Sequence, residues 1–350
     1  MQHGGNIYGK QIAMDYSVNL NPLGIPEEIL LAGEMASRRY GVYPDPAQEE
    51  VRRSIADLEM VSPDAVLAGN GASELLLAVV RAVGPKSALL FEPAYGGYEY
   101  ALASVGCRIH HVMTEAGMPP FDGEEEAKAA EEFPEIVFIC DPSNPMGRNV
   151  EDEKLRGFLD RMKRRGTKVV LDESFLLMSD KARDVSARRR GALTEEYGNL
   201  FIVRSLTKIL ASPGIRMGYV ISAPENIAAV KRLLPEWNLS ATAEEAIIAG
   251  CRLLKESDLI DRGLQMIREE RAYLIREVSA MGFAVYESEA PYFCFRGPEG
   301  LYDALLKQGI LIRDCANFRG LSKGIYRVAV KDHASNAAFC RKLKEVCADV

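Results

Sequence analysis

The chain has 350 residues, of which 47% are hydrophobic and 27% charged, and this composition predicts a soluble globular protein with a large and a smaller domain. Its net charge of −7 argues against a nucleic acid or an anionic membrane as partner, because both are bound through clustered Lys and Arg side chains. The seven cysteines include no C-x-x-C pair and the four histidines include no i, i+4 pair, so we expect no metal site. The sequence lacks a signal-peptide core and any run of about 20 apolar residues, so we expect a cytoplasmic location.

Residues 1–40 are predicted to form an irregular arm and a first helix that pack with the small domain. Asn21-Pro22 is a turn signal within the arm, and a helical pattern with acidic residues in its first turn covers 27–39. A loop with the sequence Tyr43-Pro44-Asp45 then leads to an amphipathic helical pattern at 47–59.

A short apolar strand at 65–68 meets a glycine-rich turn that opens a helix at 73–83. Free backbone N–H groups at such a helix N-terminus can bind a phosphate. The dinucleotide-binding fingerprint would need a glycine at position 74, and Glu74 stands there, so that class of site is disfavoured. The turn therefore predicts either a site for a single phosphate or a plain capped helix without a ligand.

Strand and helix patterns alternate through the middle of the chain. Short apolar runs predict strands at 87–91, 108–113, 136–140, 168–171, 200–203 and 217–221. Helical patterns lie between and after them at 95–105, 122–132, 151–165, 224–234 and 241–255. This order predicts an α/β fold of three layers, in which a mostly parallel sheet lies between two layers of helices.

A lysine, Lys208, follows the buried strand at 200–203, at the edge where open α/β sheets bind their ligands. Ser205 precedes it by three residues and Arg216 follows it by eight. This set could bind a phosphorylated aldehyde, with the lysine as the Schiff-base partner and the other two side chains on the phosphate. The plainer interpretation is a loop lysine in water.

Tyr95, Asn144 and Asp172 lie at or just after the ends of other predicted strands, so they should reach the same edge of the sheet. Each alone has a simple structural role, as a packing residue, a turn residue or a helix cap. Together they offer what a pyridoxal phosphate ring needs, namely an aromatic face, an amide for the ring oxygen and a carboxylate for the pyridine nitrogen.

Four motifs occur in a characteristic order, PSNPMG at 142–147, LDE at 171–173, SLTK at 205–208 and GIRMG at 214–218. Together they resemble the fold type I pyridoxal-phosphate enzymes of the aminotransferase class I and II family, over nearly the whole chain. The resemblance implies pyridoxal 5′-phosphate as cofactor. It also implies a large cofactor-binding domain with a mostly parallel seven-stranded sheet at 41–255 and a small C-terminal α+β domain at 256–350.

The resemblance assigns a role to each site residue. Lys208 would carry the Schiff base, Asp172 would pair with the pyridine nitrogen, Asn144 would contact the ring oxygen and Tyr95 would stack on the ring. The cofactor phosphate would be bound by Gly71, Ala72, Ser73, Ser205 and Arg216. Tyr43 resembles the tyrosine that these enzymes lend to the phosphate site of the neighbouring subunit, which implies a homodimer.

Two positions depart from the family pattern. Met146 stands where the family usually has threonine, and we expect cofactor binding to survive this change. Phe175 stands where many members have a tyrosine that bonds the ring oxygen. Asn144 is therefore expected to be the main partner of that oxygen.

The C-terminal part follows a long helical pattern at 258–281 and contains strand patterns at 291–296, 310–318 and 325–330. Arg327 lies within the last of these. A buried arginine is unfavourable unless it finds an anion, and the plain candidate is a structural carboxylate. By the family resemblance, Arg327 would instead bind the α-carboxylate of the substrate.

The residues at 3–6 and 15–24, Phe175 and the run at 310–318 look most like the threonine-phosphate decarboxylases of the cobalamin pathway, which are relatives of the histidinol-phosphate aminotransferases. That likeness implies that His3, Asn19 and Arg313 bind a substrate phosphate. We therefore expect a decarboxylase of a phosphorylated amino acid. The alternatives are an aminotransferase and, less favoured because no basic helix-turn-helix segment precedes His3, the sensor half of a transcription regulator.

Overall fold

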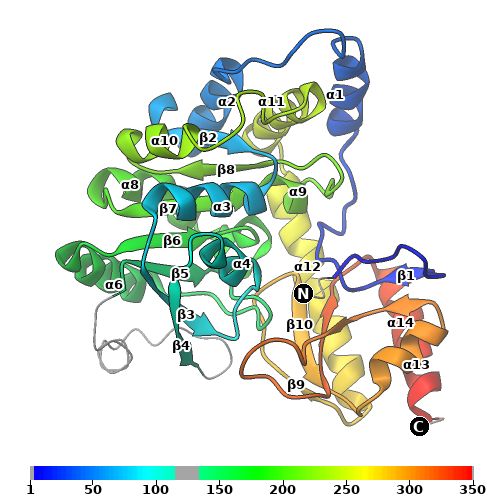
Figure 1. The fold of residues 1–350 in the computed structure, drawn as a ribbon. Helices are drawn as coiled ribbons and strands as arrows, with labels where there is room; N and C mark the ends of the chain where they lie inside the picture. Colours follow the sequence, from blue (N-terminus) through cyan, green and yellow to red (C-terminus); the bar gives the residue numbers. More distant parts are fainter. Residues whose placement is uncertain (1–3, 115–133, 349–350) are drawn as a thin grey trace.

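The computed structural model describes residues 4–114 and 134–348. Its main element is a seven-stranded sheet in the order β2-β8-β7-β6-β5-β3-β4 (Figure 1). The strands are β2 (Val66–Gly69), β3 (Ser87–Glu92), β4 (Arg108–Met113), β5 (Ile136–Cys140), β6 (Lys168–Asp172), β7 (Leu200–Ser205) and β8 (Gly218–Ile221). Strand β8 is antiparallel to both neighbours and the other pairings are parallel, which confirms the predicted mostly parallel sheet.

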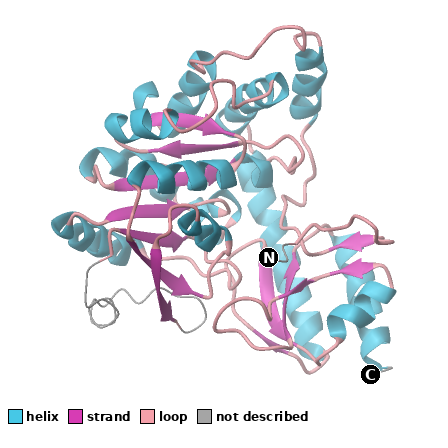
Figure 2. Cartoon of the chain, in the orientation of Figure 1, coloured by secondary structure: helices cyan, strands magenta, loops and turns pink. Residues whose placement is uncertain are grey.

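Helices cover both faces of this sheet (Figure 2). They are α2 (Glu49–Glu59), α3 (Ala72–Val83), α4 (Gly97–Ala103), α6 (Asp152–Arg165), α7 (Val185–Arg188), α8 (Leu193–Glu196), α10 (Pro224–Lys231) and α11 (Ala241–Glu256). Side chains of a strand alternate between the faces. In β5, Phe138 accordingly packs in the core under α3 and α4, while Val137 and Ile139 pack in the core under α6 and α11. The predicted helix at 122–132 lies outside the described residues.

A second, antiparallel sheet has the order β12-β13-β10-β9. Its strands are β9 (Ala284–Val285), β10 (Tyr292–Arg296), β12 (Arg313–Asp314) and β13 (Ile325–Ala329), and helices α13 (Leu301–Lys307) and α14 (His333–Ala348) pack beside it. The predicted strand at 310–318 is therefore broken: β11 (Ile310–Leu311) pairs with β1 (Met14–Asp15) instead. The domain limits at 41–255 and 256–350 remain a prediction.

The long helix α12 (Leu259–Ala280) belongs to two hydrophobic cores. Leu264 and Ile267 pack in the core of the large sheet, and Leu274 and Val278 pack under the small sheet. None of the helices described here is long and apolar enough to cross a bilayer.

The first helix, α1 (Glu27–Ser37), packs on α11 and not on the C-terminal sheet as predicted. Ile29 is buried in the core of the large sheet, and its side chain lies close to Gly250 of α11. The arm before it does join the C-terminal part, because β1 pairs with β11 and Tyr16 stacks on Phe339. The apolar face of α1 packs on the larger core, while the arm before it packs on the C-terminal part. The N-terminal segment therefore connects the two parts of the fold.

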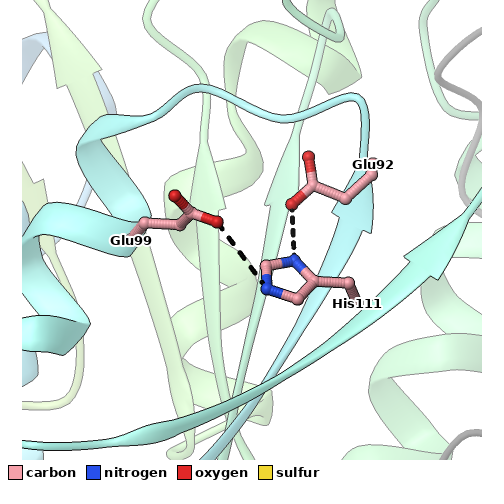
Figure 3. A group of neighbouring side chains, drawn as sticks. All are labelled: Glu92, Glu99 and His111. Atoms are coloured by element: carbon pink, nitrogen blue, oxygen red, sulfur yellow. Dashed lines mark hydrogen bonds and ion pairs between the residues drawn. The ribbon is translucent and has the colours of Figure 1, made fainter. Parts of the chain in front are cut away.

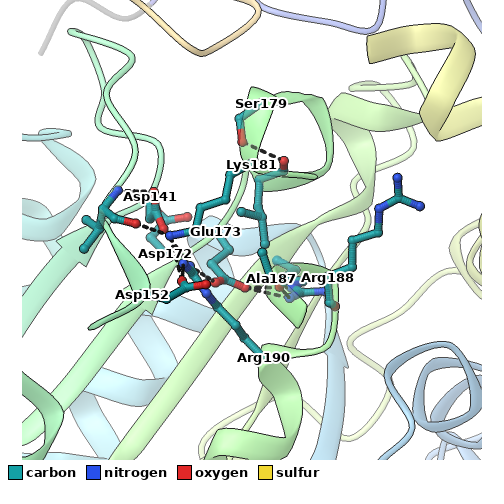
Figure 4. A network of polar contacts seen from close by, with 12 residues as sticks. Asp141, Asp152, Asp172, Glu173, Ser179, Lys181, Ala187, Arg188 and Arg190 are labelled. Atoms are coloured by element: carbon teal, nitrogen blue, oxygen red, sulfur yellow. Dashed lines mark hydrogen bonds and ion pairs between the residues drawn. The ribbon is translucent and has the colours of Figure 1, made fainter. Parts of the chain in front are cut away.

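A network of buried charges lies at the carboxyl ends of β5, β6 and β7, and Figure 4 shows the part around Asp141, Glu173 and Arg190. Arg190 donates to Asp141 at 2.6 Å and to Glu173 at 2.9 Å. Arg204 donates to the other oxygen of Glu173 at 2.9 Å and to Glu59 at 2.7 Å. All five side chains are buried, so each charge depends on its partners in place of water.

We predict that Arg190→Ala lowers the free energy of unfolding by about 3–5 kcal/mol, because it leaves Asp141 without its guanidinium partner inside the protein. Urea denaturation of the cofactor-free protein measures this. Arg156→Ala is the matched control, since Arg156 pairs with Glu196 at 3.3 Å on the surface, and should lose about 1 kcal/mol or less. Equal losses in the two variants would contradict a structural role for the network.

Candidate active site

A cavity of about 800 Å³ opens between the large sheet and the C-terminal sheet. Most of the residues predicted to form a site line it: Asn19, Ala72, Ser73, Tyr95, Asn144, Asp172, Ser205, Lys208, Arg216, Arg313 and Arg327. Gly71 lies directly behind Arg216 and is not part of the wall. Tyr43 lies outside the cavity and is 76% exposed. His3 lies outside the described residues.

Alternation along three neighbouring strands separates the cavity from the charge network. Cys140, Asp172 and Ser205 end β5, β6 and β7, and all three line the cavity. The charged residues next to them, Asp141, Glu173 and Arg204, belong to the buried network on the opposite side. Neighbouring side chains of a strand point to opposite faces of the sheet. The charge network therefore packs against one face of the strand ends, and the cavity lies at the other face.

Asp172 is a buried carboxylate with three donors. The hydroxyl of Tyr98 donates to Oδ2 at 2.7 Å, and the backbone N–H and hydroxyl of Ser174 donate to Oδ1 at 3.0 and 2.6 Å. Burial raises the pKa of Asp172, and the hydrogen bonds from Ser174 and Tyr98 act against that rise by favouring the charged form. Such a carboxylate can face a cationic ring nitrogen in the cavity.

Tyr98 and Ser174 are absent from the sequence prediction. The ring of Tyr98 stacks on Phe138 at 4.9 Å and meets the edge of Tyr95 at 5.5 Å, so the two tyrosines form one aromatic unit beside Asp172. Their spacing of three residues, close to one helical turn, is the signal that could have found Tyr98. The side chain of Ser174 forms a local turn with a residue two positions earlier, a common role for Ser after Asp.

Lys208 lies in the short helix α9 (Leu206–Ile209), which begins directly after β7. Burial, together with the positive charges of Arg327 and Arg216, lowers the pKa of its amine to about 8, while Asp172 acts in the opposite direction. The arm holds this turn, because the Asn21 backbone N–H donates to the Lys208 carbonyl at 3.0 Å. Near neutral pH about a tenth of the Lys208 amine is therefore neutral, far more than for a lysine with an ordinary pKa.

An anion cradle lies beside Lys208, at the N-terminus of α3. Gly71 has a φ of 82°, and a Cβ atom there would lie 2.6 Å from Nη2 of Arg216, so only glycine allows the guanidinium this close. The backbone of Ala72 and Ser73 starts α3, and the hydroxyl of Ser205 lies 2.7 Å from that of Thr207. Free N–H groups, two hydroxyls and one guanidinium fit a phosphate group.

Two arginines of the C-terminal sheet face each other across β12 and β13. Arg313 and Arg327 are direct cross-strand neighbours, and both are buried. Arg327 donates to Asn144 Oδ1 at 2.5 Å and to the Ser17 carbonyl at 3.0 Å, and Arg313 donates to Asn317 Oδ1 at 2.7 Å. Within the described part of the chain, neither of these two arginines forms an ion pair with a carboxylate. Their like charges, placed directly opposite each other, repel. The pair therefore favours an anionic ligand.

Further details of the wall agree with this arrangement. The Asn144 oxygen accepts from Arg327, so its amide hydrogens remain to donate to a ligand oxygen. Oδ1 of Asn19 is buried and has no hydrogen-bond partner among the described residues. Phe175 lines the cavity and meets the edge of Tyr292 at 5.1 Å, whereas Met146 packs away from the cavity, in a small core with Cys294 and Cys315.

The fold and this site define a pyridoxal-phosphate enzyme of fold type I. The family model "Aminotransferase class I and II" matches residues 11–343, so the chain belongs to this pyridoxal-phosphate-dependent family. Threonine-phosphate decarboxylase of Salmonella typhimurium is 30% identical, with 98% of this chain and 96% of that relative covered.

Two solved structures show the same architecture. The histidinol-phosphate aminotransferase of Clostridium acetobutylicum has a TM-score of 0.86 and 32% identity, with 96% of this chain and 100% of that one covered. The histidinol-phosphate aminotransferase of Sinorhizobium meliloti, in complex with pyridoxal-5′-phosphate, has a TM-score of 0.86 and 23% identity, with coverage of 97% and 92%. These likenesses confirm the predicted fold class.

We predict that the reductive methylation of Lys208 by formaldehyde and cyanoborohydride in the cofactor-free protein is half-maximal near pH 8, because burial and the neighbouring arginines lower its pKa to about 8 and only the neutral amine attacks a carbonyl. Mass spectrometry of peptides from samples labelled across a pH series measures this. Arg327→Gln should move the midpoint upward, since it removes a positive charge that lowers the pKa of Lys208. The prediction fails if Lys208 follows the same pH profile as the exposed lysines.

Proposed function

We propose that the protein is a pyridoxal-phosphate-dependent decarboxylase of a phosphorylated amino acid, of the threonine-phosphate decarboxylase kind. The observation that carries this proposal is the facing pair Arg313 and Arg327, two buried guanidinium groups without a carboxylate partner in the described part of the chain. They suit a substrate with two anionic ends, a carboxylate and a phosphate. The name of the Salmonella relative supports the same substrate class.

The cofactor fits the cavity residues. We propose that Lys208 holds it as a Schiff base, that Asp172 faces its pyridine nitrogen, and that Asn144 and Tyr95 contact the ring oxygen and the ring face. Its phosphate would lie in the cradle formed by Gly71, Ala72, Ser73, Ser205 and Arg216. When bound, this cofactor acts as an electron sink for the bonds at the substrate Cα.

The protein's own groups would orient the substrate and move its proton. Arg327 would grip the α-carboxylate, with its guanidinium already fixed by Asn144 and Ser17. Arg313 and Asn19, together with His3, would hold the phosphate. With a pKa of about 8, the Lys208 amine can both accept and return a proton at Cα. Fixing both ends of the substrate determines which bond at Cα is held for cleavage.

The second candidate is an aminotransferase, which the 32% identity to the Clostridium structure favours. In that reaction the Cα–H bond breaks, and an aminotransferase also needs a 2-oxo acid as amino acceptor. The residues that bind the cofactor are shared by both reactions. Which of the two reactions occurs therefore depends on which bond at Cα the arginines hold perpendicular to the cofactor ring.

We predict that the purified protein with pyridoxal phosphate releases carbon dioxide from O-phosphothreonine when no 2-oxo acid is present. Headspace carbon dioxide and the amine product are measured together. Lys208→Ala should abolish release, because it removes the amine that binds the cofactor and moves the proton. Turnover of histidinol phosphate alone, and only with 2-oxoglutarate added, would instead establish the aminotransferase.

We also propose a homodimer, as is typical of the family, in which Tyr43 reaches the cofactor phosphate of the partner subunit. Tyr43 is exposed and leans on Trp237 at 4.8 Å. Other exposed apolar side chains lie in α1 and the loop that follows it: Leu30, Leu31, Met35, Tyr40 and Val42. An exposed apolar surface of this kind supports an interface.

We predict that light scattering shows a dimer. Tyr43→Phe should lower the affinity for the cofactor at least about tenfold, because a hydrogen bond to a charged group contributes about 1.5–3 kcal/mol. Fluorescence titration of the cofactor-free protein with pyridoxal phosphate measures the affinity. Tyr302→Phe, on α13 in the C-terminal part, is the control and should bind normally. A monomer with full cofactor affinity would refute the role of Tyr43.

We place a cofactor-binding domain at 41–255 and a small domain at 256–350, and we propose that the protein works in the cytoplasm on a small molecule. All seven cysteines are free thiols, which suits a reducing compartment.

A further inference from the structure

The segment 315–322, between β12 and β13, lies between the substrate arginines and the edge of the large sheet. Of its residues, Ala316, Asn317, Phe318, Arg319, Gly320 and Leu321 line the cavity. We propose that Arg319 is a positioning residue whose ion pairs with Glu99 and Glu92 fasten this segment across the cavity and thereby set the affinity for the substrate phosphate through Arg313. This inference rests on the proposed function.

The anchor for Arg319 is built from three elements of the large sheet layer (Figure 3). Glu92 ends β3, Glu99 lies in α4 and His111 lies in β4. The imidazole sits between the two carboxylates, with Nδ1 at 2.8 Å from Glu92 and Nε2 at 3.6 Å from Glu99. Glu92 is only 3% exposed, and its other oxygen accepts the Ala94 N–H at 2.8 Å. Contacts other than the one with Arg319 therefore fix the position of the Glu92 carboxylate.

Arg319 reaches this anchor from the opposite wall. Its Nη2 lies 3.1 Å from Glu99 and its Nε lies 3.9 Å from Glu92. The next residue, Gly320, is close to β4 as well, because a Cβ atom there would lie 3.2 Å from the sulfur of Met113. Two adjacent residues of the segment thus contact the edge of the large sheet.

The same segment positions Arg313. Asn317 accepts from the Arg313 guanidinium at 2.7 Å, and the ring of Phe318 lies under that guanidinium at 5.0 Å. The turn is internally bonded, since the Phe318 N–H donates to the Cys315 carbonyl at 3.0 Å. Arg319 directly follows Phe318, so releasing Arg319 also loosens the two side chains that orient Arg313.

Arg319 has a second effect through charge. Glu92 and Glu99 both line the cavity, where their carboxylates repel a phosphate unless a cation lies beside them. The ligand atoms of Glu92, Glu99 and His111 lie within 4.8 Å of one another, a spacing that could hold a metal ion. The two carboxylates, however, face different ring nitrogens, and the Arg319 guanidinium already lies beside them and would repel a metal cation.

The decisive variant is Arg319→Gln in the cofactor-loaded protein. We expect the Michaelis constant for O-phosphothreonine to rise about fivefold, the effect of losing one half-exposed ion pair, while kcat stays the same. The Michaelis constant for threonine, which lacks the phosphate, should not change. Arg319→Lys should recover part of the affinity. Arg156→Gln, which removes a surface arginine of similar exposure that does not line the cavity, should leave both constants unchanged.

Two measurements do not depend on decarboxylation. Hydrogen exchange of the backbone amides at 315–322 should be faster in Arg319→Gln than in the parent protein. Calorimetric titration of the cofactor-loaded protein with inorganic phosphate should show about fivefold weaker binding in that variant. If the parent protein does not decarboxylate phosphothreonine, the proposed function fails, and these two results still decide the role of Arg319.

The double variant Glu99→Arg with Arg319→Glu reverses the ion pair and should restore slow exchange at 315–322. Equal changes in the Michaelis constants of the phosphorylated and unphosphorylated substrates would overturn the proposal. Unchanged exchange and unchanged phosphate binding in Arg319→Gln would overturn it as well.

Discussion

The buried pairing of Arg190 and Arg204 with Glu173 is the constraint on which the site depends. These charges lie under the ends of three parallel strands, where water cannot compensate for a wrong register. Because a strand turns each successive side chain to the other face, fixing Glu173 below fixes Asp172 above. The same alternation places Ser205 on the face opposite the network. The ion pairs therefore fix the positions of the cavity-lining side chains at these strand ends.

Positive charge shapes the chemistry of the cavity. Arg327 lies near Lys208 and also directly across from Arg313, so three cationic side chains share one small volume. Burial and the neighbouring arginines favour the neutral lysine amine, while an anionic ligand relieves the repulsion between the arginines. One arrangement thus favours both a neutral lysine amine and an anionic ligand.

Much of the fold could be predicted because its signals are local. Apolar runs predicted the strands of the large sheet, and motif spacing placed Lys208, Asp172 and Asn144 at one edge. Arg319 could not be found this way, since its role comes from a contact with Glu99 that is distant in sequence. The spacing of Tyr98 from Tyr95 indicates an aromatic pair but not the bond to Asp172. The packing of α1 and the break after β11 were also missed, because both depend on which distant surface fits best.

The hydrogen bond from Arg327 to the Ser17 carbonyl joins positions 310 residues apart. During synthesis the amino-terminal arm leaves the ribosome long before β13 exists, so this part of the wall cannot close on a nascent chain. This part of the cavity wall is therefore one of the last features to form, and an incomplete chain has the arm without the arginine that binds it.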